Sequence, residues 1–194
     1  MDQRAELADA VRRLIAASVR NEAPEALLGE VAAEIGEQAE RLERHALDHR
    51  PEGQGDGMAA RMPFDAVIGR CNPLAVPVVL DFDGEVVRGR ARFTAPYEGP
   101  PDCVQGGIIA ACFDIVLSAA TFIHDAAGPT ISLTLRYRKP TKLWVESVFE
   151  AALDRREGVR SHAAGRLVQD GVVTVEAEAV FANIGRQRTR RLGR

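Results

Sequence analysis

This sequence of 194 residues has few cysteines, no long apolar run and little net charge. Its three cysteines, Cys71, Cys103 and Cys112, have no paired spacing, which excludes a disulfide framework and favours a cytoplasmic location. No apolar run of about 18 residues lacks charge, so we expect no membrane span. The formal net charge of −3 excludes binding to nucleic acid through the charge of the whole molecule.

Motifs for several common chemistries are also missing. The sequence has no GxSxG nucleophile motif, no Walker phosphate-binding loop and no dinucleotide-binding fingerprint. His45 and His49 have helical i,i+4 spacing, but no HExxH pattern accompanies them, so we expect no metal ion and no cofactor. The acidic and amphipathic start, MDQRAELADA, is not that of a signal peptide.

Hydrophobic residues form 46% of the sequence, enough for a sizeable core, and their spacing divides the chain into parts. A helical period predicts one helix over residues 3–21 and a second that Pro24 opens, since proline is favoured at the first helical position. A Gly- and Pro-rich flank follows these helices. The predicted parts are an N-terminal helical extension over 1–50, a linker over 51–62, a main domain over 63–185 and a basic tail over 186–194.

Beyond the linker the hydrophobic period changes to two, which is typical of β-strands. In residues 130–138 this alternation predicts apolar side chains on one face and Thr130, Arg136 and Arg138 together on the other. Strands are predicted over residues 76–82, 85–94, 130–138, 143–156, 159–169 and 172–183.

The most informative stretch runs from Tyr97 to His124. A Pro- and Gly-rich loop leads into Gly106-Gly107, and a nearly all-apolar helix follows over 106–124 with Asp114 in its middle. A carboxylate is costly to bury, so it needs a reason to be there. A Gly-Gly helix start leaves backbone N–H groups free to hold a negative oxygen. The stretch therefore predicts a site that stabilises an oxyanion beside an acid or base.

The order of these elements is two strands, one buried helix and an antiparallel meander. A sheet wrapped around the helix would cover it from every side, which explains why the helix is apolar all round. Together the loop, the Gly-Gly start, the carboxylate and the meander resemble the hotdog fold. More narrowly, residues 63–183 resemble the PaaI-like acyl-CoA thioesterases of the phenylacetate pathway. The expected fold class is thus α+β, an antiparallel sheet around one long central helix with an N-terminal helical extension.

Members of that group typically carry His-Gly-Gly, with Asp seven residues after the second glycine. The matching residues here are Gln105, Gly106, Gly107 and Asp114. Gln105 therefore stands where histidine is commonest, and it can donate a hydrogen bond but cannot shuttle a proton near neutral pH. The resemblance implies hydrolysis of an acyl-CoA to a free acid and coenzyme A.

Each candidate residue has an expected role in that chemistry. The Gly107 N–H is a natural oxyanion donor, and Asp114 either activates a water or attacks the thioester directly. The resemblance also implies that Thr130 holds the carboxylate or the water. The candidates are Asp114, Gly107 and Thr130 for catalysis, Gln105 and Gly106 for substrate positioning, and Arg136, Arg138 and Lys139 for the phosphates of coenzyme A.

The spacing of the two central groups has a consequence for assembly. Seven residues of helix separate Gly107 from Asp114 by about 10 Å, so one carbonyl cannot approach within about 3–3.5 Å of both. If both act, they come from different subunits, and the resemblance likewise implies a homodimer, often doubled to a tetramer, with sites at the interface.

Two other functions remain open. One is a hotdog protein that binds acyl-CoA without hydrolysing it, and the other is an acyl-CoA sensor whose first helices bind DNA. Residues 1–50 hold 7 basic and 11 acidic residues, a net of −4, which argues against DNA binding. A dehydratase is less favoured, because no His–Asp pair lies on a comparable loop and helix.

Overall fold

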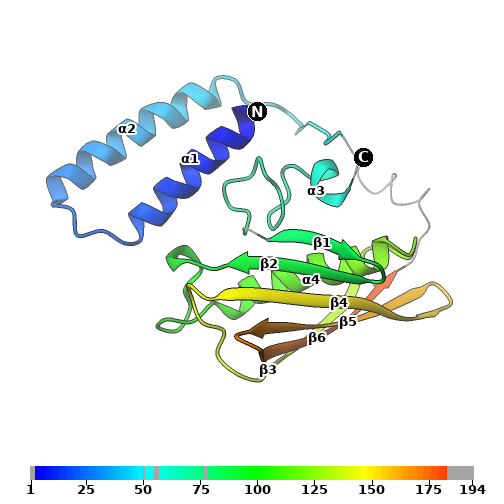
Figure 1. Ribbon diagram of the computed structural model, residues 1–194. Helices are drawn as coiled ribbons and strands as arrows, with labels where there is room; N and C mark the ends of the chain where they lie inside the picture. The colour runs from blue at the N-terminus through cyan, green and yellow to red at the C-terminus, as the bar shows by residue number, and fades with distance from the viewer. Residues whose placement is uncertain (1–2, 50, 55–56, 77, 183–194) are drawn as a thin grey trace.

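The computed structural model describes residues 3–49, 51–54, 57–76 and 78–182 (Figure 1). The predicted basic tail over 186–194 lies outside the described residues. One antiparallel sheet carries a long helix on one face, and a pair of N-terminal helices lies apart from the sheet.

The helices are α1 (Gln3–Ser18), α2 (Glu25–Glu43), α3 (Met58–Arg61), the short 3-10 turn η1 (Ala95–Tyr97) and α4 (Gly106–Phe122). The strands are β1 (Val79–Asp83), β2 (Val86–Arg92), β3 (Thr130–Tyr137), β4 (Glu146–Glu157), β5 (Arg160–Gln169) and β6 (Val172–Ala182). All six predicted strands are found, each shifted by no more than three residues at its ends.

The six strands form one sheet in the order β1-β2-β4-β5-β6-β3, and every neighbouring pair is antiparallel. Helix α4 packs across this sheet and contacts β2, β3, β4, β5 and β6 (Figure 1). The α+β hotdog architecture predicted from the sequence is confirmed. β3 ends the sheet on one side, and β6 is its only strand neighbour among the described residues.

Two glycines let the helix approach the sheet closely. A Cβ added at Gly89 would lie 2.9 Å from Cγ2 of Val116, a buried residue of α4. A Cβ added at Gly165 would lie 3.3 Å from Cδ2 of Leu117 and only 2.6 Å from a backbone oxygen of β4. Any larger residue at either position would push α4 away from the strands.

Aromatic side chains fill the space between α4 and the sheet. Phe113 of α4 meets Phe149 of β4 edge-to-face with ring centroids 5.0 Å apart, and both rings are fully buried. The other face of α4 is different, because Asp114 and Ser118 are half-buried and Gly107 is exposed. The expectation that the sheet covers the helix from every side is therefore wrong for a single chain. Six strands curve around one side only.

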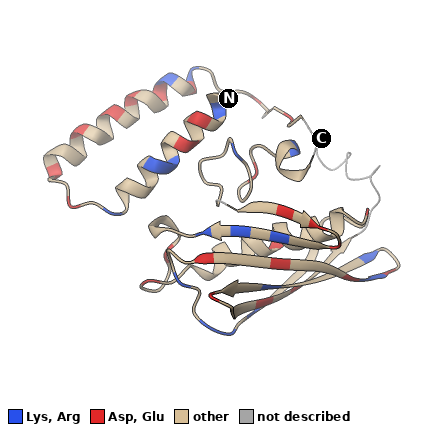
Figure 2. Cartoon of the chain, in the orientation of Figure 1, with Lys and Arg blue, Asp and Glu red and all other residues tan. Residues whose placement is uncertain are grey.

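The N-terminal region departs from the sequence prediction in two places. Pro24 is the N-cap of α2 rather than its first helical residue, and α3 forms within the segment predicted to be a linker. Helix α2 buries none of its side chains and displays a series of acidic residues (Figure 2). Among the described residues, no helix is both long enough and apolar enough to cross a membrane.

Candidate active site

The N-terminus of α4 is fixed by the side chain of Gln105. This residue is extended (φ −63°, ψ 130°), and its Oε1 accepts a hydrogen bond of 3.0 Å from the Ile108 N–H. The same N–H makes the first intrahelical bond, to the Gln105 carbonyl at 3.1 Å. No carbonyl of the helix can therefore accept from the N–H groups of Gly106 and Gly107, which leaves two donors for an anionic oxygen.

A side chain at either glycine would crowd a group that contacts the start of α4. A Cβ at Gly107 would lie 2.9 Å from Oε1 of Gln105, which is too close for the cap to keep its position. A Cβ at Gly106 would lie 3.2 Å from the hydroxyl of Tyr137, at the far end of β3. Gly106 is half-buried, whereas Gly107 is exposed. Gly107 is also the residue whose N–H the sequence analysis assigned to the oxyanion.

Asp114 has a specific partner. The Thr130 hydroxyl donates a hydrogen bond to its Oδ1 at 2.7 Å, which is short and charge-assisted. Thr130 opens β3, and the carboxylate lies on the half-buried face of α4. The structure therefore brings together two residues that lie 16 positions apart in the sequence.

A β-bulge creates this contact and corrects one expectation from the sequence. Thr130 lies opposite Phe181 while Ser132 lies opposite Val180, so Ile131 is an extra residue in the ladder. Phe181 is fully buried on the face that packs against α4. The bulge places Thr130 on that same face, so the prediction that it shares a face with the arginines of β3 is wrong.

Tyr137 belongs to the site, although the sequence assigned it only to an apolar strand face. Its hydroxyl donates to the Gly106 carbonyl at 2.8 Å, and desolvation by burial raises the pKa of this phenol above its usual value, which keeps it a neutral donor. β3 thus contacts α4 at the glycine start through Tyr137 and at mid-helix through Thr130. The alternation of apolar and polar residues in β3, which places Tyr137 on the apolar face, was the only sequence signal that could have suggested its contact with α4.

The arginines of β3 lie on the opposite side of the sheet from α4. Arg136 pairs with Glu178 at 3.2 Å and Arg138 pairs with Glu176 at 2.7 Å, and all four side chains are well exposed. Arg136 also lines a hollow of about 550 Å³ whose lining includes none of Asp114, Gly106 and Gly107. The Lys139 side chain has no carboxylate within ion-pair distance in the described part of the chain. The assignment of these cations to coenzyme A stays a prediction.

Cys112 lies within α4 close to the site but is unsuited to nucleophilic chemistry. It is fully buried, and burial raises the pKa of its thiol to about 12. A protonated thiol is a poor nucleophile, so Cys112 acts as a small apolar residue. Within the described ranges, no cluster of three or more His, Cys, Asp or Glu residues has the arrangement of a metal site.

Comparison with solved structures gives a clear relative. The thioesterase superfamily protein RHA08564 is 34% identical, with a TM-score of 0.83 over 92% of this chain and 90% of its own. The chain belongs to the thioesterase superfamily. Because at most 8% of the chain lies outside this match, the superfamily member RHA08564 also shares most of the N-terminal helical region. No family model and no curated protein matches the sequence.

More distant structures share the fold alone. The PaaI protein of the phenylacetic acid degradation operon of E. coli is 12% identical, with a TM-score of 0.53 over 57% of this chain and 81% of its own. A hypothetical thioesterase protein of Streptococcus pneumoniae TIGR4, solved with coenzyme A, is 14% identical, with a TM-score of 0.52 over 56% and 89%. RHA08564 thus confirms the thioesterase superfamily that the sequence pattern implies, and PaaI supports the predicted fold.

Proposed function

We propose that this protein is an acyl-CoA thioesterase that hydrolyses its substrate to a free carboxylic acid and coenzyme A. The observation that carries the proposal is the Thr130–Asp114 hydrogen bond of 2.7 Å, which fixes a half-buried carboxylate on the exposed side of α4. Asp114 either takes a proton from the attacking water or attacks the thioester carbon itself. The N–H of Gly107 stabilises the negative charge on the carbonyl oxygen.

We propose further that the site is completed by a second copy of the chain. One helix holds Gly107 and Asp114 about 10 Å apart along its axis, so a single chain cannot apply both groups to one carbonyl. β3 offers a free edge, and its Ile131 and Tyr137 are 53% and 54% exposed. Antiparallel pairing of β3 with its own copy would set Asp114 of one chain against the partner's Gly107. A dimer of such dimers is compatible with this arrangement.

We propose coenzyme A as the carrier, because the Streptococcus pneumoniae neighbour was solved with it. Of the three cations assigned to its phosphates from the sequence, we retain Lys139, with Gln105 and Gly106 holding the thioester end. Arg136 and Arg138 are weaker candidates, because they pair with glutamates on the face of the sheet away from α4.

One observation favours a second function, binding of acyl-CoA without turnover. Gln105 occupies the usual histidine position, and its Oε1 is already used to cap the helix at Ile108. Only the amide N–H₂ of this side chain is then left for a substrate. Tight binding of an acyl-CoA with no hydrolysis would favour this alternative.

The deciding experiment is a thiol-release assay over short, medium, long and aromatic acyl-CoAs. We expect turnover of at least one of them, with a loss of about 10²–10⁴-fold in Asp114→Asn if the carboxylate is the base. Ser118→Ala is the matched control, because Ser118 is half-buried on the same face of α4, one turn away. Full activity in Asp114→Asn would remove this residue from the mechanism.

A further inference from the structure

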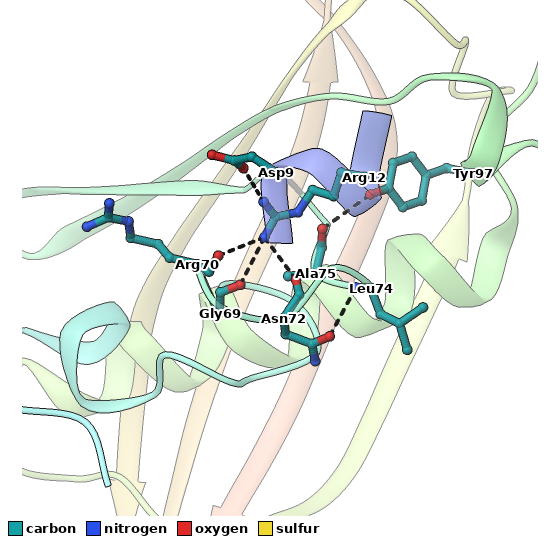
Figure 3. A network of polar contacts seen from close by, with 8 residues as sticks. All are labelled: Asp9, Arg12, Gly69, Arg70, Asn72, Leu74, Ala75 and Tyr97. Atoms are coloured by element: carbon teal, nitrogen blue, oxygen red, sulfur yellow. Dashed lines mark hydrogen bonds and ion pairs between the residues drawn. The ribbon is translucent and has the colours of Figure 1, made fainter. Parts of the chain in front are cut away.

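Helix α1 packs on the rest of the molecule through the buried Ala5 and Ala8, and Arg12 hydrogen-bonds it to one loop of the main domain. Nη2 of Arg12 donates to three backbone carbonyls of one loop, those of Gly69 at 3.2 Å, Arg70 at 3.1 Å and Asn72 at 2.8 Å (Figure 3). Asp9, one turn earlier, also contacts the guanidinium. The Arg12 side chain is only 24% exposed, whereas Asp9 is 72% exposed. Nη2 carries two hydrogens, so the three carbonyls share them, while Nη1 makes the contact with Asp9.

The loop held by Arg12 is hydrogen-bonded to Tyr97. The Tyr97 hydroxyl donates to the Ala75 carbonyl at 3.2 Å (Figure 3). The Tyr97 ring packs edge-to-face against Phe93, with ring centroids 5.9 Å apart. Burial raises the pKa of this phenol above its usual value, and the charge of Arg12 opposes the rise. Tyr97 therefore stays a neutral donor over the working pH range of most enzymes.

The backbone of Tyr97 then reaches the start of α4. The Tyr97 carbonyl accepts a hydrogen bond of 2.9 Å from the Gln105 N–H. Gln105 in turn caps the helix through its side chain, and its carbonyl accepts from Ile109 at 3.3 Å. An unbroken series of contacts thus leads from α1 to the residue that fixes the orientation of the bare Gly106 and Gly107 donors.

We infer that Arg12 and Tyr97 are positioning residues for the oxyanion donors of α4, so that the N-terminal helical region is part of the catalytic apparatus. The inference rests on the proposed function for its catalytic consequence. Neither residue touches the substrate. Arg12 holds the 69–75 loop, Tyr97 connects this loop to Gln105, and Gln105 sets the direction of the glycine N–H groups. A small displacement of such donors is costly, because catalysis depends on their preset geometry.

Two substitutions test the two ends of this series. Arg12→Met removes the donors but keeps an unbranched side chain, and Tyr97→Phe removes only the hydroxyl and keeps the ring against Phe93. We expect kcat to fall about tenfold in each variant while KM changes less than about twofold, since transition-state contacts are lost rather than ground-state binding. Arg13→Met is the matched control, because Arg13 is the adjacent, exposed arginine of the same helix. It should leave kcat unchanged.

Amide hydrogen exchange provides a readout that does not require activity. In Arg12→Met and Tyr97→Phe, the amides of Gln105, Ile108 and Ile109 should exchange at least about tenfold faster, since local opening becomes easier. The amide of Leu117, in the middle of α4, should be unaffected. The double variant should lose no more kcat than the more damaged single variant, because contacts in series are not additive.

The outcomes separate this inference from the proposed function. If the protein hydrolyses thioesters but both variants keep wild-type kcat and exchange, the positioning role is refuted and the thioesterase proposal stands. If only the melting temperature falls, Arg12 has a structural role alone and the inference is likewise wrong. If no thioester is hydrolysed, the proposed function fails, and the exchange of Gln105, Ile108 and Ile109 then decides whether Arg12 orders the start of α4.

Discussion

The Thr130–Asp114 hydrogen bond can be removed without changing the shape of the site. Valine is nearly isosteric with threonine and favours strands equally well, so Thr130→Val should preserve β3 and its bulge. The bond is 2.7 Å long and its acceptor is a carboxylate oxygen. Hydrogen bonds to charged groups contribute about 1.5–3 kcal/mol, which corresponds to a factor of about 10–150 in rate if the bond orients the reacting carboxylate.

The assay for this variant is steady-state hydrolysis of the best acyl-CoA of the panel, followed by thiol release. We expect kcat to fall within that range and KM to change little, because Asp114 contributes to the transition state rather than to binding. Thr130→Ser keeps the hydroxyl and should recover most of the activity. Thr134→Val is the matched control, since Thr134 is an exposed threonine of the same strand and lies opposite Glu178, away from α4.

Wild-type kcat in Thr130→Val would refute the reasoning. It would mean that the carboxylate is held in its working position by something other than the threonine hydroxyl. A similar loss in Thr134→Val would refute it in another way, because the effect would then come from β3 as a whole.

Three further predictions concern the surroundings of the site. Gly107→Ala should displace the side chain of Gln105 that caps α4 and reduce kcat strongly. Tm should fall by about 2–4 °C for each kcal/mol of stability lost with the cap. Unchanged Tm and kcat would contradict the cap geometry. With a thiol pKa of about 12, only about one Cys112 in ten thousand is ionised at pH 8. A thiol reagent should therefore label the half-buried Cys103 far faster than Cys112. Equal labelling rates would contradict the burial of Cys112. Tyr137→Phe should lower the free energy of unfolding by about 0.5–1.5 kcal/mol in a urea titration, and no loss would show that its hydroxyl bond is not formed in solution.

Much of the fold could be predicted because its signals are local. Alternating hydrophobicity and the turn glycines located every strand, and Gly158 and Gly171 indeed have positive φ values of 58° and 76°. The apolar helix with a single carboxylate was equally visible. Gln105 lies at the glycine start of α4 and Thr130 lies beside Asp114, as the sequence predicted. Their catalytic roles stay predictions.

The remaining contacts depend on pairings between distant segments. A bulge at Ile131 cannot be recognised from β3 alone, because it is defined by the register against β6, and it reverses the face of Thr130. The attachment of Arg12 was equally hidden, since its partners are backbone carbonyls 57 to 60 residues away whose direction only the folded loop determines. Tyr137 reaches Gly106 across 31 residues for the same reason.

If the proposed function and pairing of β3 hold, turnover would depend on protein concentration. This single edge strand holds the carboxylate at one end and the glycine start of α4 at the other, and it is also the strand we expect a second copy to cover. Dilution below the dissociation constant of that pair would then weaken both halves of the chemistry at once. Specific activity would fall with dilution, so the amount of enzyme in the cell would set the rate per molecule as well as the number of molecules.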